Sequence, residues 1–381
     1  MFEECRDDAA LVCNAEGTSF DMVQCPYGCG ESGCLPCTTP ECETRLIPKF
    51  APDVCTELST NDAVVYAADT EIDTSDAASC DEILPQAAGP EICVIRAPTI
   101  RIAAQRVVKV RGSRAIAFIA DRELDIDGTL DVSADRTTNG PGGGFTKSGT
   151  SAGDAGGGAG YRTAGGSGAS AAGPGGAGNG GPTGSSPLLI TTLLGGTQPT
   201  TAATAEPPGG AGGAAMLVSC RGETAVRGLI DAGGGGGGGD YLYTTPPPIM
   251  VVLVRASGGG SGGTVIIQGM IVRVVGELYA NGGGGGGGGQ PGSGGTDGHR
   301  STTAAPGGPD NTVTQGDASG GNGGAVTSPT NGNGNNNSTG LGAGGGSAGY
   351  IVVFAPTGAS TQLTALTVSP AIDSSTVPTT N

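Results

Sequence analysis

The sequence predicts an all-β fold, namely a β-solenoid of the parallel β-helix or β-sandwich-like kind, preceded by a disulfide-rich module. Two observations lead to this prediction. Glycine accounts for 77 of the 381 residues, and short β-branched segments recur between the glycine tracts. Hydrophobic residues make up 36% of the chain and aromatic residues 3%, and tryptophan is absent. Any core must therefore be thin and built from Val, Ile, Leu and Ala.

Residues 1–58 form the first predicted domain, a Cys-rich module. The segment has turn residues throughout and too few apolar residues to fold without cross-links, so we interpret it as stapled by disulfides whose pairing stays open. The spacing Cys34-x2-Cys37 also suits zinc, but a second matching pair is missing. Cys220 is left over in a strand-like context, where we expect a small buried hydrophobe. The disulfide candidates are Cys5, Cys13, Cys25, Cys29, Cys34, Cys37, Cys42, Cys55, Cys80 and Cys93.

Residues 59–381 form the second predicted domain, in which one unit repeats. Each unit reads as a strand of about five residues, a few polar residues or glycines, and a second strand. Because a single unit buries only one narrow face, the units must stack, which is the logic of a solenoid. A less complete copy covers 93–110, and 249–254 reads as one further strand. The four full units are 115–120 with 130–134, 215–218 with 229–233, 264–267 with 278–282, and 350–354 with 366–368.

Long Gly-rich excursions separate the units, at 135–213, 233–248 and 281–348. Their low charge and their content of Pro, Ala and Asn favour ordered polyproline II packing, in which missing side chains let backbones approach closely. The entropy lost on ordering glycine favours the alternative of flexible tethers. Glycine does not recur at every third residue, which excludes a collagen triple helix.

The formal net charge of −17, with 18 Lys and Arg, speaks against a nucleic-acid partner. Nineteen of the 35 acidic residues fall within the first hundred positions. No apolar run approaches the length of a membrane span, and residues 1–5 lack the features of a signal peptide. Because the cysteines indicate an oxidising compartment, we expect a signal peptide outside this numbering and an extracellular or cell-surface location.

Few residues suggest chemistry, so we expect no enzyme, no cofactor and no metal site. Asp125, Asp127 and Asp131 resemble a carboxylate cluster, in which Asp125 and Asp127 share one face of a strand, and we favour outward-facing solvated acids over a calcium site. Residues 235–242, which include Asp240, match a calcium-binding β-roll repeat once, whereas that repeat works only in stacked copies. His299 lies in a Gly-rich excursion, where a surface role is expected. A polysaccharide-acting enzyme stays a minor alternative, because charged residues do not recur between the units.

Three segments carry a family resemblance: residues 23–29 (VQCPYGC), 110–114 (VRGSR) and 127–134 (DGTLDVSA). Their order, leading into Gly-rich tracts, resembles that of large Gly-rich surface proteins of myxobacteria and their relatives. The excursions are more loosely similar to Gly-rich surface proteins of mycobacteria and to polyproline II sandwiches of phage adhesins. The resemblance implies secretion to the cell surface.

These observations lead to a functional prediction of a secreted structural surface protein that self-associates, for instance into a fibre or sheath. Residues 367–372 are expected to take part in edge pairing. The alternative is an adhesin that presents Gly-rich loops to a surface glycan or another cell. Its expected contact residues are Tyr161, Tyr241, Tyr243 and Tyr279, although Tyr279 fits a packed position within its strand equally well.

Overall fold

The computed structural model describes residues 44–145, 155–169, 192–199, 207–244, 251–289, 291–298, 300–310, 318–333 and 341–380, together with the backbone of five strands nearer the N-terminus. Those five strands form a three-stranded antiparallel sheet and a short hairpin. They are β1 (Phe2–Arg6), β2 (Ala9–Cys13), β3 (Phe20–Gln24), β4 (Cys29–Gly30) and β5 (Gly33–Cys34).

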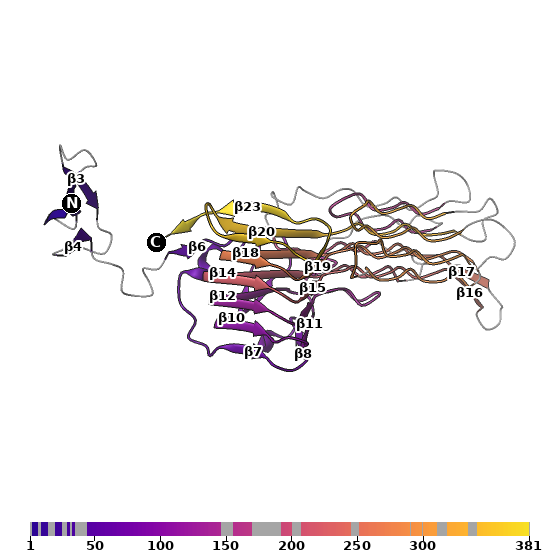
Figure 1. The fold of residues 1–381 in the computed structure, drawn as a ribbon. Coiled ribbons are helices and arrows are strands. Elements are labelled where there is room, and N and C mark those ends of the chain that lie inside the picture. Colours follow the sequence, from indigo (N-terminus) through magenta and orange to yellow (C-terminus); the bar gives the residue numbers. More distant parts are fainter. Residues whose placement is uncertain are drawn as a thin grey trace.

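The main body is built on two parallel sheets (Figure 1). The larger has nine strands, all parallel except β9. They are β7 (Val64–Tyr66), β9 (Glu82–Leu84), β10 (Ile92–Ile102), β12 (Ala115–Ile126), β14 (Ala214–Val226), β18 (Thr264–Val274), β20 (Tyr350–Pro356), β21 (Thr361–Leu363) and β23 (Asp373–Val377). The smaller has six, namely β8 (Thr70–Asp73), β11 (Val107–Arg111), β13 (Thr129–Asp131), β15 (Leu229–Asp231), β19 (Glu277–Tyr279) and β22 (Thr367–Ser369).

The remaining elements are short. The pairs β6 (Arg45–Leu46) with β24 (Thr379–Thr380) and β16 (Tyr241–Thr244) with β17 (Val251–Val254) are antiparallel. Two single-turn 3-10 helices cover Pro52–Cys55 and Ala77–Ser79. The described part of the chain contains no α-helix.

The repeating units align in register across both sheets. Ile116 of β12 lies opposite Ala215 of β14, which lies opposite Val265 of β18, which in turn lies opposite Ile351 of β20. A turn of two residues after each of the three long strands β12, β14 and β18 starts a short strand of the second sheet. The expected strand pairs therefore form, although the first strand of each unit extends beyond the predicted apolar run.

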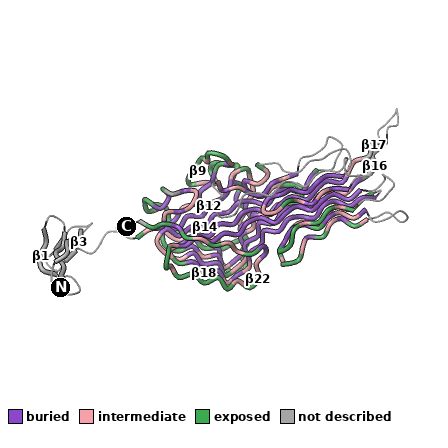
Figure 2. The backbone as a smooth tube through the Cα atoms, turned by 90° about the horizontal axis from the view of Figure 1, so that it is seen from above, coloured by how far each residue is buried: buried purple, intermediate pink, exposed green. Residues whose placement is uncertain are grey.

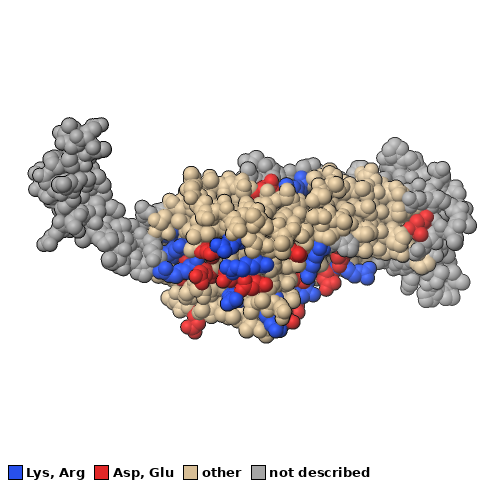
Figure 3. Space-filling model, viewed as in Figure 1, with Lys and Arg blue, Asp and Glu red and all other residues tan. Residues whose placement is uncertain are grey.

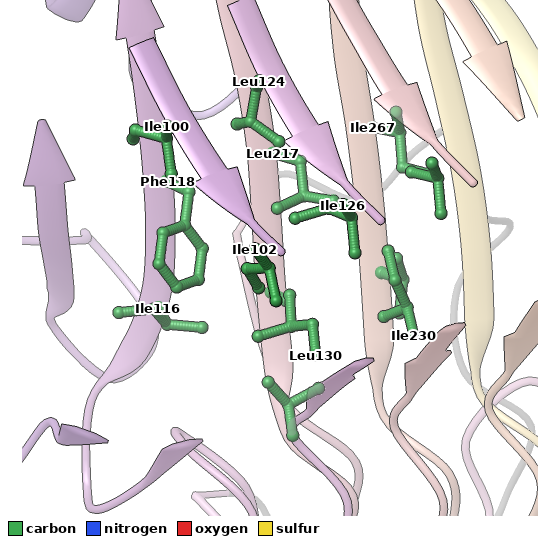
Figure 4. Close-up of a cluster of buried hydrophobic side chains, with 14 of the residues drawn as sticks. Ile100, Ile102, Ile116, Phe118, Leu124, Ile126, Leu130, Leu217, Ile230 and Ile267 are labelled. Carbon is green, nitrogen blue, oxygen red and sulfur yellow. The ribbon is translucent and has the colours of Figure 1, made fainter. Parts of the chain in front are cut away.

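Period-2 alternation divides the apolar side chains between two cores. Ile116 and Phe118 point between the two sheets, where they pack with Leu130 and Ile230 of the second sheet (Figure 4). The intervening residue Ala117 faces the opposite side of the nine-stranded sheet and belongs to a second cluster. Because successive strand residues point to opposite faces, a run with apolar residues at every position can fill both cores.

The predicted β-solenoid is wrong. In a solenoid, short links of similar length carry the chain from one turn to the next, so that it coils continuously around one core. Here the links between successive units cover residues 132–213, 232–263 and 280–349, and their described parts extend beyond one end of the sheets as a separate bundle. The architecture is two parallel sheets with an attached bundle. Repeated strand pairs predicted the stacking, but the same repeats occur in both architectures.

The links form a Gly-rich bundle, defined here by the described parts of 155–169, 208–213, 233–240, 256–263, 281–310, 318–333 and 341–349. The bundle extends to one side of the sheets, and most of its residues are buried (Figure 2). Its one cluster of buried apolar side chains in the described residues is small and consists of Ala155, Ala169, Ala256, Leu341 and Ala343. Side-chain burial therefore contributes little, and backbone contacts must hold the bundle together.

Backbone hydrogen bonds connect each bundle segment to several neighbours. The segment 233–239 donates N–H···O bonds to 209–212 and 281–287, and it accepts them from 257–262 and 292–298. A β-strand bonds in two opposite directions only, whereas an extended helix with three residues per turn presents its groups around its axis. The described excursions are thus ordered, and their bonding differs from that of a sheet.

Candidate functional site

Polar residues form a row across the six-stranded sheet, next to the Gly-rich bundle. The parallel register places Lys109, Asp131, Asp231, Tyr279 and Ser369 side by side on successive strands. All five occupy the same position of the repeating unit. Since a parallel sheet stacks equivalent positions into a ladder, the repeat itself assembles this row.

Arg300 reaches from the bundle to the two carboxylates at the centre of the row. Its Nε lies 2.6 Å from Oδ2 of Asp231, and its Nη2 lies 3.7 Å from Oδ2 of Asp131. Burial raises the pKa of the Asp231 carboxyl, and the charge of Arg300 opposes that rise. Oδ1 of Asp231 also accepts a 3.0 Å hydrogen bond from the N–H of Gly233. Arg300 therefore fastens the bundle to the sheet through a largely buried charge.

We call Arg300 together with Asp131 and Asp231 the clamp. The carboxylate of Asp131 has further partners of its own. Its Oδ1 accepts hydrogen bonds from the hydroxyl and the N–H of Ser133, at 2.6 and 3.0 Å. The Nη2 of Arg111 lies 3.7 Å from its Oδ2. Each acid of the clamp is thus engaged by at least one cation and one hydrogen-bond donor.

A polar cavity of about 350 Å³ opens at this junction. Asp231, Asp297 and Arg300 line it together with Ser133, Thr296 and backbone of the bundle. The Asp297 carboxylate accepts hydrogen bonds from the N–H groups of Gly236, at 2.8 Å, and Arg136, at 3.3 Å. The described residues contain no group of three or more His, Cys, Asp or Glu that could hold a metal ion. The arrangement suits a fastening contact between two layers better than acid–base chemistry, because its carboxylates already have donors.

Replacing Arg300 with methionine should lower the free energy of unfolding by about 2 kcal/mol, because it leaves the buried Asp231 carboxylate without its cation. Chemical denaturation measures the loss. The matched control is Arg101→Met, which removes a 2.7 Å ion pair to Asp127 from a side chain that is 55% exposed and should cost less than about 1 kcal/mol. Adding Asp231→Asn to Arg300→Met should recover part of the loss. An equal loss in the two arginine variants would contradict the clamp.

A second set of polar contacts holds residues 45–59, which we call the strap, against the outer face of the nine-stranded sheet. The backbone of Lys49 exchanges hydrogen bonds with the buried side chain of Gln268, and Ser59 N–H donates to Asp121 at 2.7 Å. Apolar strap residues, among them Leu46 and Val54, join the second core. The domain boundary at residue 58 stays a prediction.

Two disulfides lie within the described residues. Cys55 of the strap bonds Cys220 of β14, and Cys80 bonds Cys93. The expectation that Cys220 is an unpaired hydrophobe is therefore wrong. It is buried as expected, but its partner comes from the Cys-rich region 165 residues earlier. The other seven candidates, Cys5, Cys13, Cys25, Cys29, Cys34, Cys37 and Cys42, have side chains outside the described residues, as has the zinc alternative at Cys34 and Cys37.

Several other predicted residues have clear positions. Asp125 and Asp127 are ion-paired rather than freely solvated, because Arg227 lies 2.9 and 3.2 Å from them and Arg101 contacts Asp127 as well. Figure 3 shows the interleaved charges over the strands. His299 lies outside the described residues.

The predicted tyrosine contacts need a correction. Tyr161 is buried, and its hydroxyl bonds the Leu194 carbonyl and lies 2.8 Å from the Thr264 hydroxyl. Tyr279 is 2% exposed. Neither can serve as a surface contact, because both sit where the bundle meets the sheets. Tyr241 and Tyr243 belong to β16, and their side chains lie outside the described residues.

Asp240 is buried at the base of the hairpin formed by β16 and β17, with 1% of its surface exposed. Burial raises its pKa to about 7; Arg255 opposes the rise and Asp310 adds to it. The aspartate of the β-roll match is therefore buried. Among the described residues, no cluster of three or more His, Cys, Asp or Glu surrounds it that could hold a metal ion.

The raised pKa of Asp240 predicts a pH dependence. Between its ordinary value of 3.8 and about 7, the folded chain holds the proton more tightly than the unfolded chain. Its contribution to stability is therefore present at low pH and is lost as the pH rises through 7. Asp240→Asn should raise the melting temperature at pH 8 more than at pH 5, whereas Asp62→Asn, at an exposed position, should change both little. Thermal unfolding at the two pH values measures this, and equal shifts for Asp240→Asn would refute the assignment.

Sequence reasoning grouped Asp131 with Asp125 and Asp127, and it did not predict the contact of Asp131 and Asp231 with Arg300. Asp131 and Asp231 are the last residues of equivalent strands in two of the aligned units. An aspartate that recurs at the same position of the repeat could therefore have indicated this site. No sequence pattern indicated Arg300, because it follows His299 in a Gly-rich excursion and is 69 residues away from Asp231.

Comparisons with known proteins add nothing to this picture, because no family model, curated protein or solved structure matches the chain. The resemblance to Gly-rich surface proteins of myxobacteria stays an expectation. In the described residues, no helix has the length and apolar character that a transmembrane crossing requires.

Proposed function

We propose that the protein is a secreted structural protein of the cell surface, in which the Gly-rich bundle acts as a stiff spacer. The observation that carries this proposal is that the segment 233–239 is hydrogen-bonded to four neighbouring segments. A segment bonded on several sides cannot bend alone, so the bundle should respond to force as one body. The elongated outline of the sheets and bundle in Figure 1 fits such a spacer.

The close approach of backbones supports a structural role for the glycines themselves. A Cβ added to Gly260 would lie 2.0 Å from the carbonyl oxygen of Gly210, and one added to Gly283 would lie 2.0 Å from that of Gly235. No side chain fits at such distances. Ordering so many glycines costs a large amount of backbone conformational entropy. Selection for a thin, rigid bundle explains why the chain keeps a composition with this cost.

The cross-links favour an extracellular setting. Disulfides persist in oxidising compartments, and Cys55–Cys220 ties the strap to the central strand β14. At the junction, the acids of the clamp are held by cations and N–H donors, which favours a structural over a catalytic role.

Surface exposure in the source cell tests the proposal. Antibodies raised against the purified chain should stain intact cells, and protease added outside should remove the staining while an intracellular marker protein survives. Staining that needs permeabilised cells would refute it. Small-angle scattering of the purified chain, at concentrations where it is monomeric, provides the physical control, since a stiff spacer keeps the same maximum dimension in dilute and in high salt.

An adhesin remains the second candidate, because the hairpin of β16 and β17 lies at the far end of the bundle from the sheets (Figure 1). A stiff bundle would hold that hairpin away from its base. Binding of the purified chain to a glycan array, lost when residues 241–254 are replaced by a short Gly-Ser link, would support this function. An array without binding would count against it.

A further inference from the structure

The two ends of the sheet stack differ sharply in charge. At the end formed by β7, β8 and β9, the segment 59–91 carries eight exposed carboxylates and no Lys or Arg, and Glu91 alone of the eight has a salt bridge among the described residues, to Arg114 at 2.8 Å. At the other end, formed by β20 to β23, residues 341–381 carry one charged residue, Asp373. Arg162 of the bundle lies 2.7 Å from the Asp373 carboxylate and offsets its charge. The eight carboxylates are those of Asp62, Asp69, Glu71, Asp73, Asp76, Asp81, Glu82 and Glu91.

The acidic end is built to resist pairing. Its outer strands β7 and β9 have three residues each, and β9 runs antiparallel to β10, so the parallel pattern stops there. Short edge strands and charged side chains are the usual protection of a sheet edge. The end with β22 and β23 also has a short strand, β22, but its only charged residue is Asp373, and among the described residues no strand pairs with the outer edge of β23.

An apolar knob and a groove lie together at this uncharged end. Leu366, between β21 and β22, is 78% exposed, and its N–H donates to the Gly276 carbonyl at 3.0 Å, which fixes its backbone. The groove has a volume of about 340 Å³ and lies between β20, β21 and β23. Val353, Ala355 and Leu363 supply its apolar wall. A leucine side chain is of a size that such a groove accepts.

We propose that a second copy of this chain docks on the uncharged end, so that two molecules join tail to tail with Leu366 of each in the groove of the other. A two-fold contact uses the same patch on both molecules, and one patch here carries both the knob and the groove. Each chain has a net charge of −17, so two copies repel except where both surfaces are neutral. The uncharged end is such a surface, whereas head-to-tail stacking would bury the carboxylates of the acidic end.

This inference deepens the proposed structural function by naming the partner, and it favours a closed pair over an open fibre. Surface exposure and stiffness do not depend on it. A monomeric protein that is still rigid and surface-exposed would therefore refute the pairing alone, and an intracellular protein would refute the function alone.

Sedimentation equilibrium of the full disulfide-bonded chain between 1 and 100 µM tests the pairing. We expect dimers, with association strengthened by added salt because screening weakens the mutual repulsion. Leu366→Glu should weaken dimerisation at least tenfold, because it places a carboxylate in an apolar contact. The matched control, Val65→Glu, adds the same charge to an exposed apolar residue of β7 at the opposite end and should leave the dissociation constant within twofold.

Other results would overturn the pairing. A monomer at every concentration refutes the docking surface, and filaments or larger oligomers refute the closed two-fold contact. Dimers that survive Leu366→Glu but dissociate on Val65→Glu place the contact at the acidic end. Circular dichroism of both variants checks that the sheets are intact, and a second substitution in the groove wall, Leu363→Glu, should reproduce the effect of Leu366→Glu.

Discussion

Replacing Gly260 with alanine should disrupt the Gly-rich bundle, with a loss of about 3 kcal/mol or more in the free energy of unfolding. The added Cβ would lie 2.0 Å from the Gly210 carbonyl oxygen, and this contact is to backbone, which cannot move away alone. Gly260 N–H also donates to Gly235, and its carbonyl accepts from Gly283, so a shift would break bonds on two further segments. Chemical denaturation of both proteins measures the effect.

The matched control for Gly260 lies in the same bundle. A Cβ on Gly294 would meet the end of the Arg136 side chain at 3.1 Å and the Gly237 carbonyl oxygen at 3.3 Å. A flexible side chain can give way, so Gly294→Ala should change stability by less than about 1 kcal/mol. If both variants were tolerated equally, close backbone packing would not be what holds the bundle.

Removing the Cys55–Cys220 disulfide should cost about 5 kcal/mol, because this cross-link closes a loop of 165 residues and long loops gain most from closure. The double variant Cys55→Ala with Cys220→Ala tests this by denaturant titration. In addition, the strap should become more accessible to protease, since its remaining contacts are a few hydrogen bonds, such as that between Lys49 and Gln268, and the packing of Leu46 and Val54 in the second core.

The second disulfide provides the comparison. Cys80–Cys93 closes a separation of 13 residues, for which the same loop argument gives about 3 kcal/mol. The variant Cys80→Ala with Cys93→Ala should therefore lose less, and it should leave the strap protected. A larger loss in this variant would mean that loop closure does not govern the contribution of either cross-link.

Local patterns predicted the strands but not their full length. In β12 the apolar run at 115–120 was expected to end at its first polar residues, yet the strand continues to Ile126. A register shift between Ala120 and Glu123 absorbs the break, after which Leu124 and Ile126 resume the alternation and point into the inter-sheet core. A sequence pattern with a bulge in its middle reads as two segments, although the ladder is one.

Long-range contacts explain what the sequence could not predict. The order of the links depends on bonds such as Gly235 to Gly210 and Gly260 to Gly235, and identical glycines give no indication of partner. The contact of Arg300 with Asp231 depends on that same packing. Cys220 was misjudged for a similar reason, since its partner Cys55 looked like one of the eight cysteines of a separate module at 1–58. The length of the links between the units distinguishes the observed architecture from a solenoid, because repeated strand pairs occur in both.

Hydrogen exchange of the glycine amides at 256–263 and 282–289 tests the central claim most directly. If the bundle is held by its backbone bonds, peptides from both segments should exchange about a thousandfold or more slowly than an unstructured glycine peptide, as an opening free energy of about 4 kcal/mol requires. Exchange at the rate of the unstructured peptide would show that the excursions are flexible tethers, and the stiff spacer would have to be abandoned.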